Sequence, residues 1–232
     1  MKKILLLALL AIASAPAAFA QARAGGELSS KDYTGGGSTD SRNTGFGVKG
    51  GYNLNTLRGD DIKTAIGNTS IDRKSRSDFH AGVYGQFGFN NFASVQVEAL
   101  YSRLGFAANT GTSGARQDYR MDYVSVPVMF VGNITETISF HVGPQVSLLV
   151  KADEEGKDLD FDANGLNSFD FGGVGGLEAR IGPARVGARY NLSLGKIFED
   201  GTPTAGNLAT RFSNADLYNN LFQLYVGIGI TQ

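Results

Sequence analysis

Residues 138–150 read ISFHVGPQVSLLV, and their pattern decides the fold class. From Ile138 to Val150 every second residue is apolar, with Pro144 as the one interruption. The residues between them are mostly polar or small, beginning with Ser139 and His141. A period of two puts the two sets on opposite faces of a β-strand. The pattern indicates a strand of a membrane barrel, with lipid on one side and a polar lumen on the other.

Seven other stretches alternate in the same way, so the sequence predicts eight strands: 45–57, 78–89, 92–106, 119–131, 137–151, 169–181, 184–196 and 218–230. Three connections are short and rich in the Asn, Gly and Pro that tight turns require: 90–91, 132–136 and 182–183. Four are long: 58–77, 107–118, 152–168 and 197–217. We therefore expect an all-β fold, an eight-stranded antiparallel up-and-down transmembrane β-barrel with short periplasmic turns and long extracellular loops.

The beginning of the chain predicts export. Residues 1–20 have the parts of a cleavable signal peptide: Lys2 and Lys3, an apolar middle, and small residues at Ala18 and Ala20. A retained anchor is the alternative, but the apolar middle is shorter than the roughly 20 residues of a spanning helix. Residues 21–44 are polar and rich in Gly and Ser, which predicts a flexible periplasmic lead-in. Residues 45–232 would then form the barrel.

The amino-acid composition argues against several classes of function. The net charge is −1, which gives no reason to expect a nucleic-acid partner. There is no cysteine, so disulfide and thiolate chemistry are excluded. No cofactor motif is present, and we expect no cofactor.

Charged residues near the middle of the strands fall on the inward face. A Lys or Arg facing lipid at the bilayer midplane costs about 2–4 kcal/mol, so this sorting supports the barrel. A soluble barrel, the alternative, would carry its apolar residues inside. Only Arg103 and Arg120 turn outward, toward the long-loop ends. The expected lumen charge network consists of Lys49, Glu98, Asp170, Glu178, Arg180, Arg185 and Arg189.

Two interpretations of these charges are open. They could line a narrow, selective solute channel of porin-like type, or they could pair and plug the lumen. An eight-stranded barrel is only just wide enough for its own side chains, which favours the plug.

Residues 160–165 read DFDANG, like the opening of a calcium loop, with oxygen ligands at Asp160, Asp162 and Asn164. The twelfth position of such a loop should be Glu but is Phe171. We therefore favour a solvated acidic loop and retain calcium as the weaker alternative.

The two histidines are the candidates for catalysis. His80 lies near Ser77 and Asp78, a combination that a lipid-modifying hydrolase could use, and His141 lies on the fifth strand. Alternation turns both histidines inward, away from lipid. We favour ordinary lumen histidines and expect no catalytic residues.

Several segments resemble the PorT-like outer-membrane β-barrel family of the Bacteroidetes. They are GFGVKGGYNL at 45–54, VQVEALYSRLG at 95–105, YVSVPV at 123–128 and VGPQ at 142–145. The resemblance implies an eight-stranded barrel in the outer membrane of a Gram-negative cell. It brings no catalytic residues.

The favoured function is therefore that of a non-enzymatic outer-membrane protein of the cell envelope, structural or interacting through its extracellular loops. Outer-membrane lipid is one expected partner. A protein partner is expected at residues 58–77 and 197–217, the longest loops, because function tends to sit on loops carried by a rigid scaffold. The narrow channel and the lipid-modifying hydrolase remain the alternatives.

Overall fold

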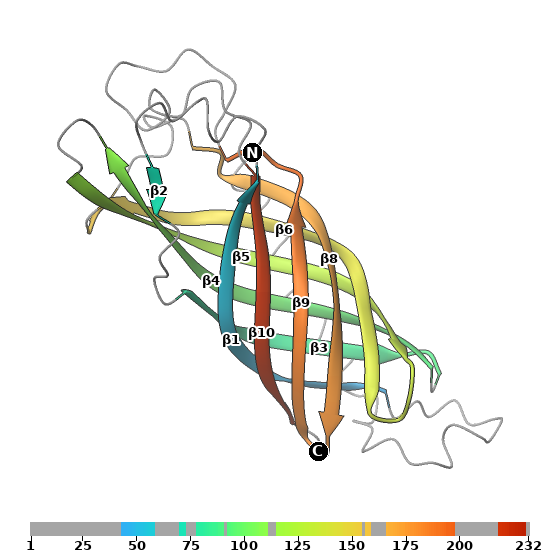
Figure 1. Ribbon diagram of the computed structural model, residues 1–232. Helices are drawn as coiled ribbons and strands as arrows, with labels where there is room; N and C mark the ends of the chain where they lie inside the picture. The colour runs from blue at the N-terminus through green and yellow to red at the C-terminus, as the bar shows by residue number, and fades with distance from the viewer. Residues whose placement is uncertain are drawn as a thin grey trace.

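The computed structural model describes residues 43–58, 70–72, 78–90, 92–110, 115–154, 156–158, 166–197 and 218–230. Eight long strands form an antiparallel meander: β1 (Gly45–Arg58), β3 (Asp78–Gly88), β4 (Ala93–Thr110), β5 (Ala115–Asn133), β6 (Ile138–Glu154), β8 (Phe169–Ile181), β9 (Ala184–Ser193) and β10 (Tyr218–Ile230). Each pairs with the next, and β1 pairs with β10, from Phe46 opposite Ile230 to Arg58 opposite Tyr218. This last pairing closes the barrel (Figure 1). The predicted all-β, eight-stranded barrel is confirmed.

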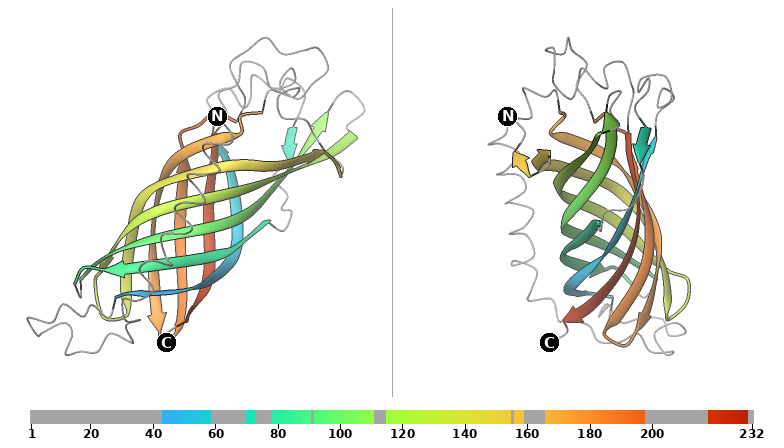
Figure 2. Two further views of the ribbon diagram at one scale, coloured as in Figure 1. Left: turned by 180° about the vertical axis from the view of Figure 1, so that it is seen from behind. Right: turned by 60° about the vertical axis from the view of Figure 1, so that its left-hand side comes forward.

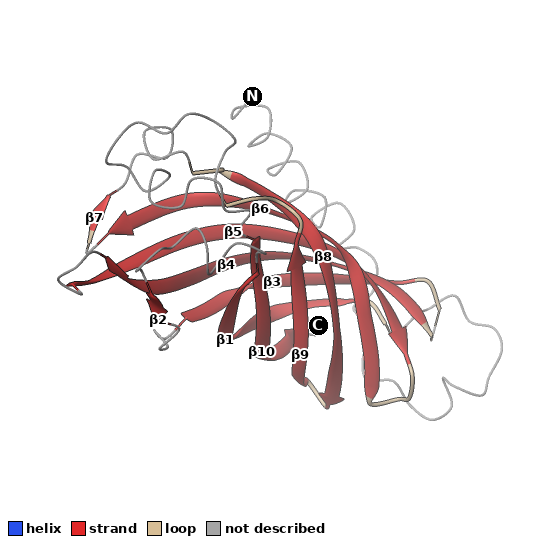
Figure 3. Ribbon diagram, turned by 45° about the horizontal axis from the view of Figure 1, so that its top comes forward, coloured by secondary structure: helices blue, strands red, loops and turns tan. Residues whose placement is uncertain are grey.

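Three strands run further than the sequence predicts. β4, β5 and β6 extend at the end that carries the long connections, and Figure 2 shows them running past the neighbouring strands. Two short strands also form within connections expected to be loops. β2 (Ser70–Asp72) pairs with β4, and β7 (Lys157–Asp158) pairs with β6 (Figure 3). In the other direction, β9 ends at Ser193, three residues before the expected boundary.

The two faces of the sheet differ as the alternation predicts. Outward residues are apolar and exposed, as for Val226 with 62% of its surface accessible. Inward residues are polar and buried, as for Glu98 at 1%. This arrangement is the reverse of a soluble ligand-binding barrel. The described residues include no helix long and apolar enough to cross a membrane.

The ends of the barrel differ in their connections. At the short-turn end, β8 and β9 are joined through Gly182, whose φ of 59° lies in the left-handed region that glycine adopts readily. The opposite, long-loop end carries the extensions of β4, β5 and β6. The proposed signal peptide and lead-in, residues 1–20 and 21–44, lie almost wholly outside the described residues and stay predictions, as does the barrel boundary at 45–232.

Candidate functional site: the barrel lumen

An ion triplet crosses the middle of the lumen. The Glu98 carboxylate accepts a hydrogen bond from Lys49 Nζ at 2.6 Å through Oε1 and another from Arg189 Nη1 at 2.6 Å through Oε2. The side chains are almost fully buried. Glu98 is on β4 and Arg189 is on β9, four strands apart in a ring of eight. Their bond therefore joins opposite walls of the barrel.

A second level lies toward the short-turn end and is centred on Glu178. Its Oε1 accepts a hydrogen bond from Arg185 Nη1 at 3.1 Å, and its Oε2 accepts one from the Tyr225 hydroxyl at 3.0 Å. Arg180 Nε lies 3.6 Å from Oε1. Lys49 Nζ is 3.9 Å from Oε2 and so connects the two levels.

Hydrogen bonds to amide side chains extend both levels. Arg185 Nη1 also donates to Gln86 Oε1 at 2.9 Å, across the lumen on β3. Arg189 Nε donates to Gln223 Oε1 at 2.6 Å. Because a buried charge is costly unless it is paired and hydrogen-bonded, these amides supply part of the hydrogen bonding that the guanidinium groups need.

Inward-facing glycines leave space for the charged and amide side chains that fill the lumen. A Cβ at Gly187 would lie against the hydroxyl of Tyr225, and a Cβ at Gly176 would lie 2.6 Å from the Cβ of Arg189. Both distances are far inside van der Waals contact, so a side chain there would displace the charged layer. These inward glycines thus have a packing explanation.

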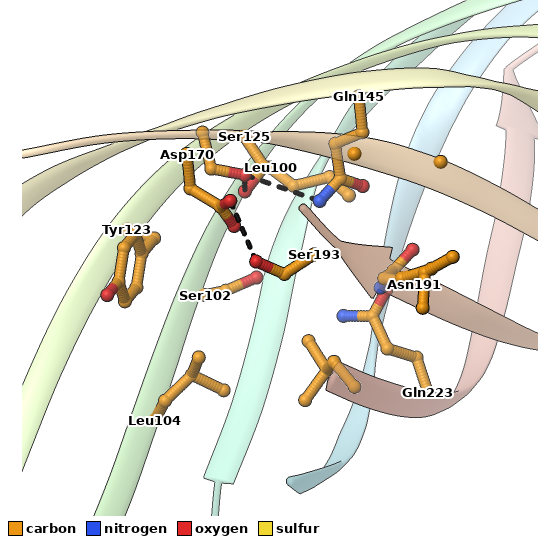
Figure 4. A pocket seen from close by; sticks show the side chains of 15 residues that line it. Leu100, Ser102, Leu104, Tyr123, Ser125, Gln145, Asp170, Asn191, Ser193 and Gln223 are labelled. Carbon is orange, nitrogen blue, oxygen red and sulfur yellow. Dashed lines mark hydrogen bonds between the residues drawn. The ribbon is translucent and has the colours of Figure 1, made fainter. Parts of the chain in front are cut away.

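A small polar cavity lies on the long-loop side of the triplet, with a volume of about 40 Å³. That is space for a few water molecules, at roughly 10–15 Å³ each on the same measure. Figure 4 shows Asn191 and Gln223 on one side of it, and Tyr123 and Leu104 on the other. Its wall also includes four serine hydroxyls: Ser102, Ser125, Ser147 and Ser193.

An apolar cluster covers this cavity from the long-loop side. Its members are contributed mainly by β4, β5, β6 and β10: Leu104, Met121, Tyr123, Leu149, Ala152, Leu166 and Leu221. Sequence reasoning did not identify this cluster. The period-two pattern marks such residues only as inward positions, and the apolar side chains at those positions look like exceptions to a polar lumen.

The structure brings six of the seven expected lumen charges into contact, and we call these six the lumen charge network: Lys49, Glu98, Glu178, Arg180, Arg185 and Arg189. Asp170 lies apart, by the cavity. It accepts hydrogen bonds from the Ser193 hydroxyl at 2.8 Å (Figure 4) and from Gly195 N at 3.1 Å. Within the described part of the chain it forms no ion pair.

The other candidates are placed as follows. His80 is buried in the lumen, where Nδ1 is 2.7 Å from Asn53 Oδ1. His141 Nε2 is 3.1 Å from the Ser139 hydroxyl and 3.8 Å from Glu178. The weak calcium candidates Asp160, Asp162 and Asn164 lie outside the described residues. Among the residues that are described, no group of three or more His, Asp or Glu is placed to hold a metal ion.

Arg103 and Arg120, the two arginines expected to face outward, both lie near the long-loop end, and Arg120 Nη1 is 3.9 Å from Asp153 Oδ1. Arg103 binds Asp122 on the neighbouring strand through two hydrogen bonds, from Nε at 2.9 Å and from Nη2 at 3.1 Å. Nη2 also donates to the Tyr101 hydroxyl at 3.0 Å. The expectation of an outward Arg103 is thus met, with a partner that sequence reasoning missed. Asp122 could have been found only from the register that places it opposite Arg103.

Comparison with known proteins locates the chain among bacterial barrels. Residues 19–199 match the family described as outer membrane protein beta-barrel domain. No curated protein matches the chain.

Solved structures of other barrels are similar to the chain at low identity, among them the following three. Ail of Yersinia pestis, solved with the heparin analogue sucrose octasulfate, is 17% identical over 81% of this chain and 99% of its own, with a TM-score of 0.44. Neisserial surface protein A is 13% identical over 80% and 97%, with a TM-score of 0.46. OprG of Pseudomonas aeruginosa is 14% identical over 82% and 97%, with a TM-score of 0.45.

Proposed function

The chain belongs to the outer membrane protein beta-barrel domain family, and we propose that it is a non-enzymatic member whose lumen is closed and whose outer loops make its contacts. The protein is one of the bacterial outer membrane. In such barrels the short turns face the periplasm and the long loops face outward. The short-turn end is therefore the periplasmic end.

The observation that carries the closed lumen is the bond between Glu98 and Arg189 across the barrel. It joins opposite walls at 2.6 Å, and the second level around Glu178 lies beneath it. On the other side, the apolar cluster covers the cavity. A solute moving through would have to break two levels of buried ion pairs and pass an apolar layer. Breaking a buried pair by removing one partner costs about 3–5 kcal/mol, which indicates a strong barrier.

Conductance of the purified barrel in planar lipid bilayers tests this proposal. The wild-type protein should give no single-channel steps. Replacing Glu98, Glu178 and Leu104 together with Ala should create conductance, because it removes the anion of each ion-pair level and part of the apolar layer. Val226→Ala, on the lipid face, is the control and should stay silent. Single-channel current steps from the wild-type protein would contradict the closed lumen. If their ion selectivity also changed when Arg189 is neutralised, the narrow solute channel would be the better description.

The contact function is assigned to the outer loops, residues 58–77 and 197–217. The support is indirect: a rigid barrel displays long loops at the cell surface, and loops carry function disproportionately. Replacing residues 198–217 with a short Gly-Ser turn should abolish binding of whole cells to the partner surface. Heat-modifiable gel mobility should remain, since the barrel strands are intact. Unchanged binding by this variant, and by a second variant in which residues 59–69 are replaced in the same way, would remove the proposed role.

The position of His80 gives the hydrolase alternative no support. Its ring faces the lumen, is 1% exposed and is bonded to Asn53. A lipid-modifying enzyme needs its base beside lipid. Within the family we further propose that the chain stands with the PorT-like barrels, on the motifs at 45–54 and 95–105. No secretion role is carried over.

A further inference from the structure

The periplasmic part of the lumen holds more positive than negative charge. The lumen charge network contains four cations (Lys49, Arg180, Arg185 and Arg189) and two carboxylates (Glu98 and Glu178). Glu98 is fully engaged by two cations at 2.6 Å. Glu178 is left as the shared partner of the other two arginines. Because isolated buried charge is expensive, an excess of this kind calls for a counter-ion.

The excess is concentrated at Arg180 and Arg185. They face each other directly across β8 and β9, and like charges in that position repel. Both approach the same oxygen, Glu178 Oε1, at 3.6 Å and 3.1 Å. One carboxylate therefore stands between two guanidinium groups.

These groups also present hydrogen-bond donors that the described residues leave without partners. Arg180 Nη1 donates to Asn43 Oδ1 at 3.0 Å, and Nε comes no closer than 3.6 Å to Glu178 Oε1, but Nη2 is buried and has no hydrogen-bond partner among the described residues. Among the described residues, all of the hydrogen bonds of Arg185 are made by Nη1.

A neutral donor lies beside them. The Tyr84 ring stacks under the Arg185 guanidinium, with 4.5 Å between Cζ and the ring centroid, and among the described residues its buried hydroxyl has no partner within hydrogen-bond distance. Buried donors without partners are uncommon in folded proteins, and each one calls for an explanation such as an absent ion or water.

We propose that a small oxyanion of the phosphate class binds at the periplasmic end of the lumen, held by Arg180, Arg185 and the Tyr84 hydroxyl. A guanidinium group presents parallel N–H donors that match two oxygens of one phosphate. The side chains of Arg180 and Arg185 are 14% and 13% exposed, so neither is fully sealed from solvent. The inference goes beyond the closed lumen and holds whether or not the barrel conducts.

Inorganic phosphate, titrated against chloride at equal ionic strength, is the probe. The folded barrel in zwitterionic detergent is followed by ³¹P line broadening and by urea unfolding. Phosphate that binds only the folded state should raise the folding equilibrium constant about 11-fold at ten times its dissociation constant. Arg180→Gln should abolish both signals. Arg103→Gln, an outward-facing arginine, is the matched control and should keep both.

Equal stabilisation of the wild-type and Arg180→Gln barrels would mean a bulk salt effect and would overturn the proposal. If Arg180→Gln does not fold, Tyr84→Phe decides, because it removes only an unpaired hydroxyl. It should weaken phosphate binding by about two- to tenfold, the value of one ordinary hydrogen bond. An unchanged affinity there would count against the site.

A carboxylate of the chain itself is the competing occupant, since Asp40 precedes Asn43 by three residues. If the wild-type barrel ignores phosphate and Asp40→Asn makes it responsive, the chain supplies its own counter-ion and the free-oxyanion site is refuted. Phosphate binding is measured without any conductance recording. The proposed oxyanion site can therefore be refuted while the closed lumen stands, and the reverse.

Discussion

Neutralising Glu98 is the sharpest test of how the lumen is held together. Glu98→Gln keeps the shape of the side chain and removes its charge, leaving Lys49 and Arg189 buried without their shared anion. Two hydrogen bonds to charged groups are affected, at about 1.5–3 kcal/mol each. Loss of one partner from a buried ion pair gives a similar figure, about 3–5 kcal/mol. We therefore expect the free energy of unfolding to fall by about 3 kcal/mol or more, roughly a hundredfold in the folding equilibrium.

The assay is urea unfolding of the barrel in detergent, followed by heat-modifiable gel mobility. Glu136→Gln is the matched control, since Glu136 is exposed in the turn between β5 and β6 and should change stability by less than about 0.5 kcal/mol. Combining Glu98→Gln with Lys49→Met should cost less than the sum of the single changes, because one of the stranded cations is gone. If Glu98→Gln cost no more than Glu136→Gln, the two cations would have other counter-charges and the reasoning would be refuted.

Three further outcomes are expected. A double-mutant cycle on Arg103 and Asp122 should give a coupling energy of about 1–3 kcal/mol in urea unfolding, and additive losses would show that the bidentate pair does not form. Gly176→Ala should destabilise the barrel by about 1–3 kcal/mol through overpacking against β9, while Gly175→Ala should be tolerated, since a Cβ there has only a backbone oxygen at 3.9 Å. Because the chain has no cysteine, a single spin label at Val226→Cys should be reached by oxygen rather than by a water-soluble nickel chelate, and the reverse would turn the barrel inside out.

The strands were predictable because a period of two is a local signal. Each of the eight expected strands overlaps one long strand of the structure, and both ends of β8 and β10 agree. The extensions of β4, β5 and β6 were not predictable in this way. Along these extensions consecutive residues are polar or charged, as at 116–118 (RQD) and 153–154 (DE), so the contrast between the two faces that marks a spanning strand disappears.

Which face a residue occupies could be predicted, but its height along the barrel could not. Asp170 and Glu178 both point inward on β8, and alternation treats them alike. Only Glu178 joins the lumen charge network, whereas Asp170 bonds with Ser193 above the ion triplet. Height depends on the stagger between neighbouring strands, which is set by the closure of the whole sheet rather than by any one segment.

The same dependence on stagger shows what the charged layer contributes to the fold. If β4 slipped by two residues relative to its neighbours, its inward side chains would still point inward, but Gln96 or Leu100 would replace Glu98 opposite Arg189. Two buried cations would then lose their anion, at a cost of the order calculated for Glu98→Gln. The apolar outer face is insensitive to such a slip, because one lipid-facing residue serves as well as another. The ion triplet therefore both closes the lumen and selects the register, the specificity role in which buried polar pairs are best established.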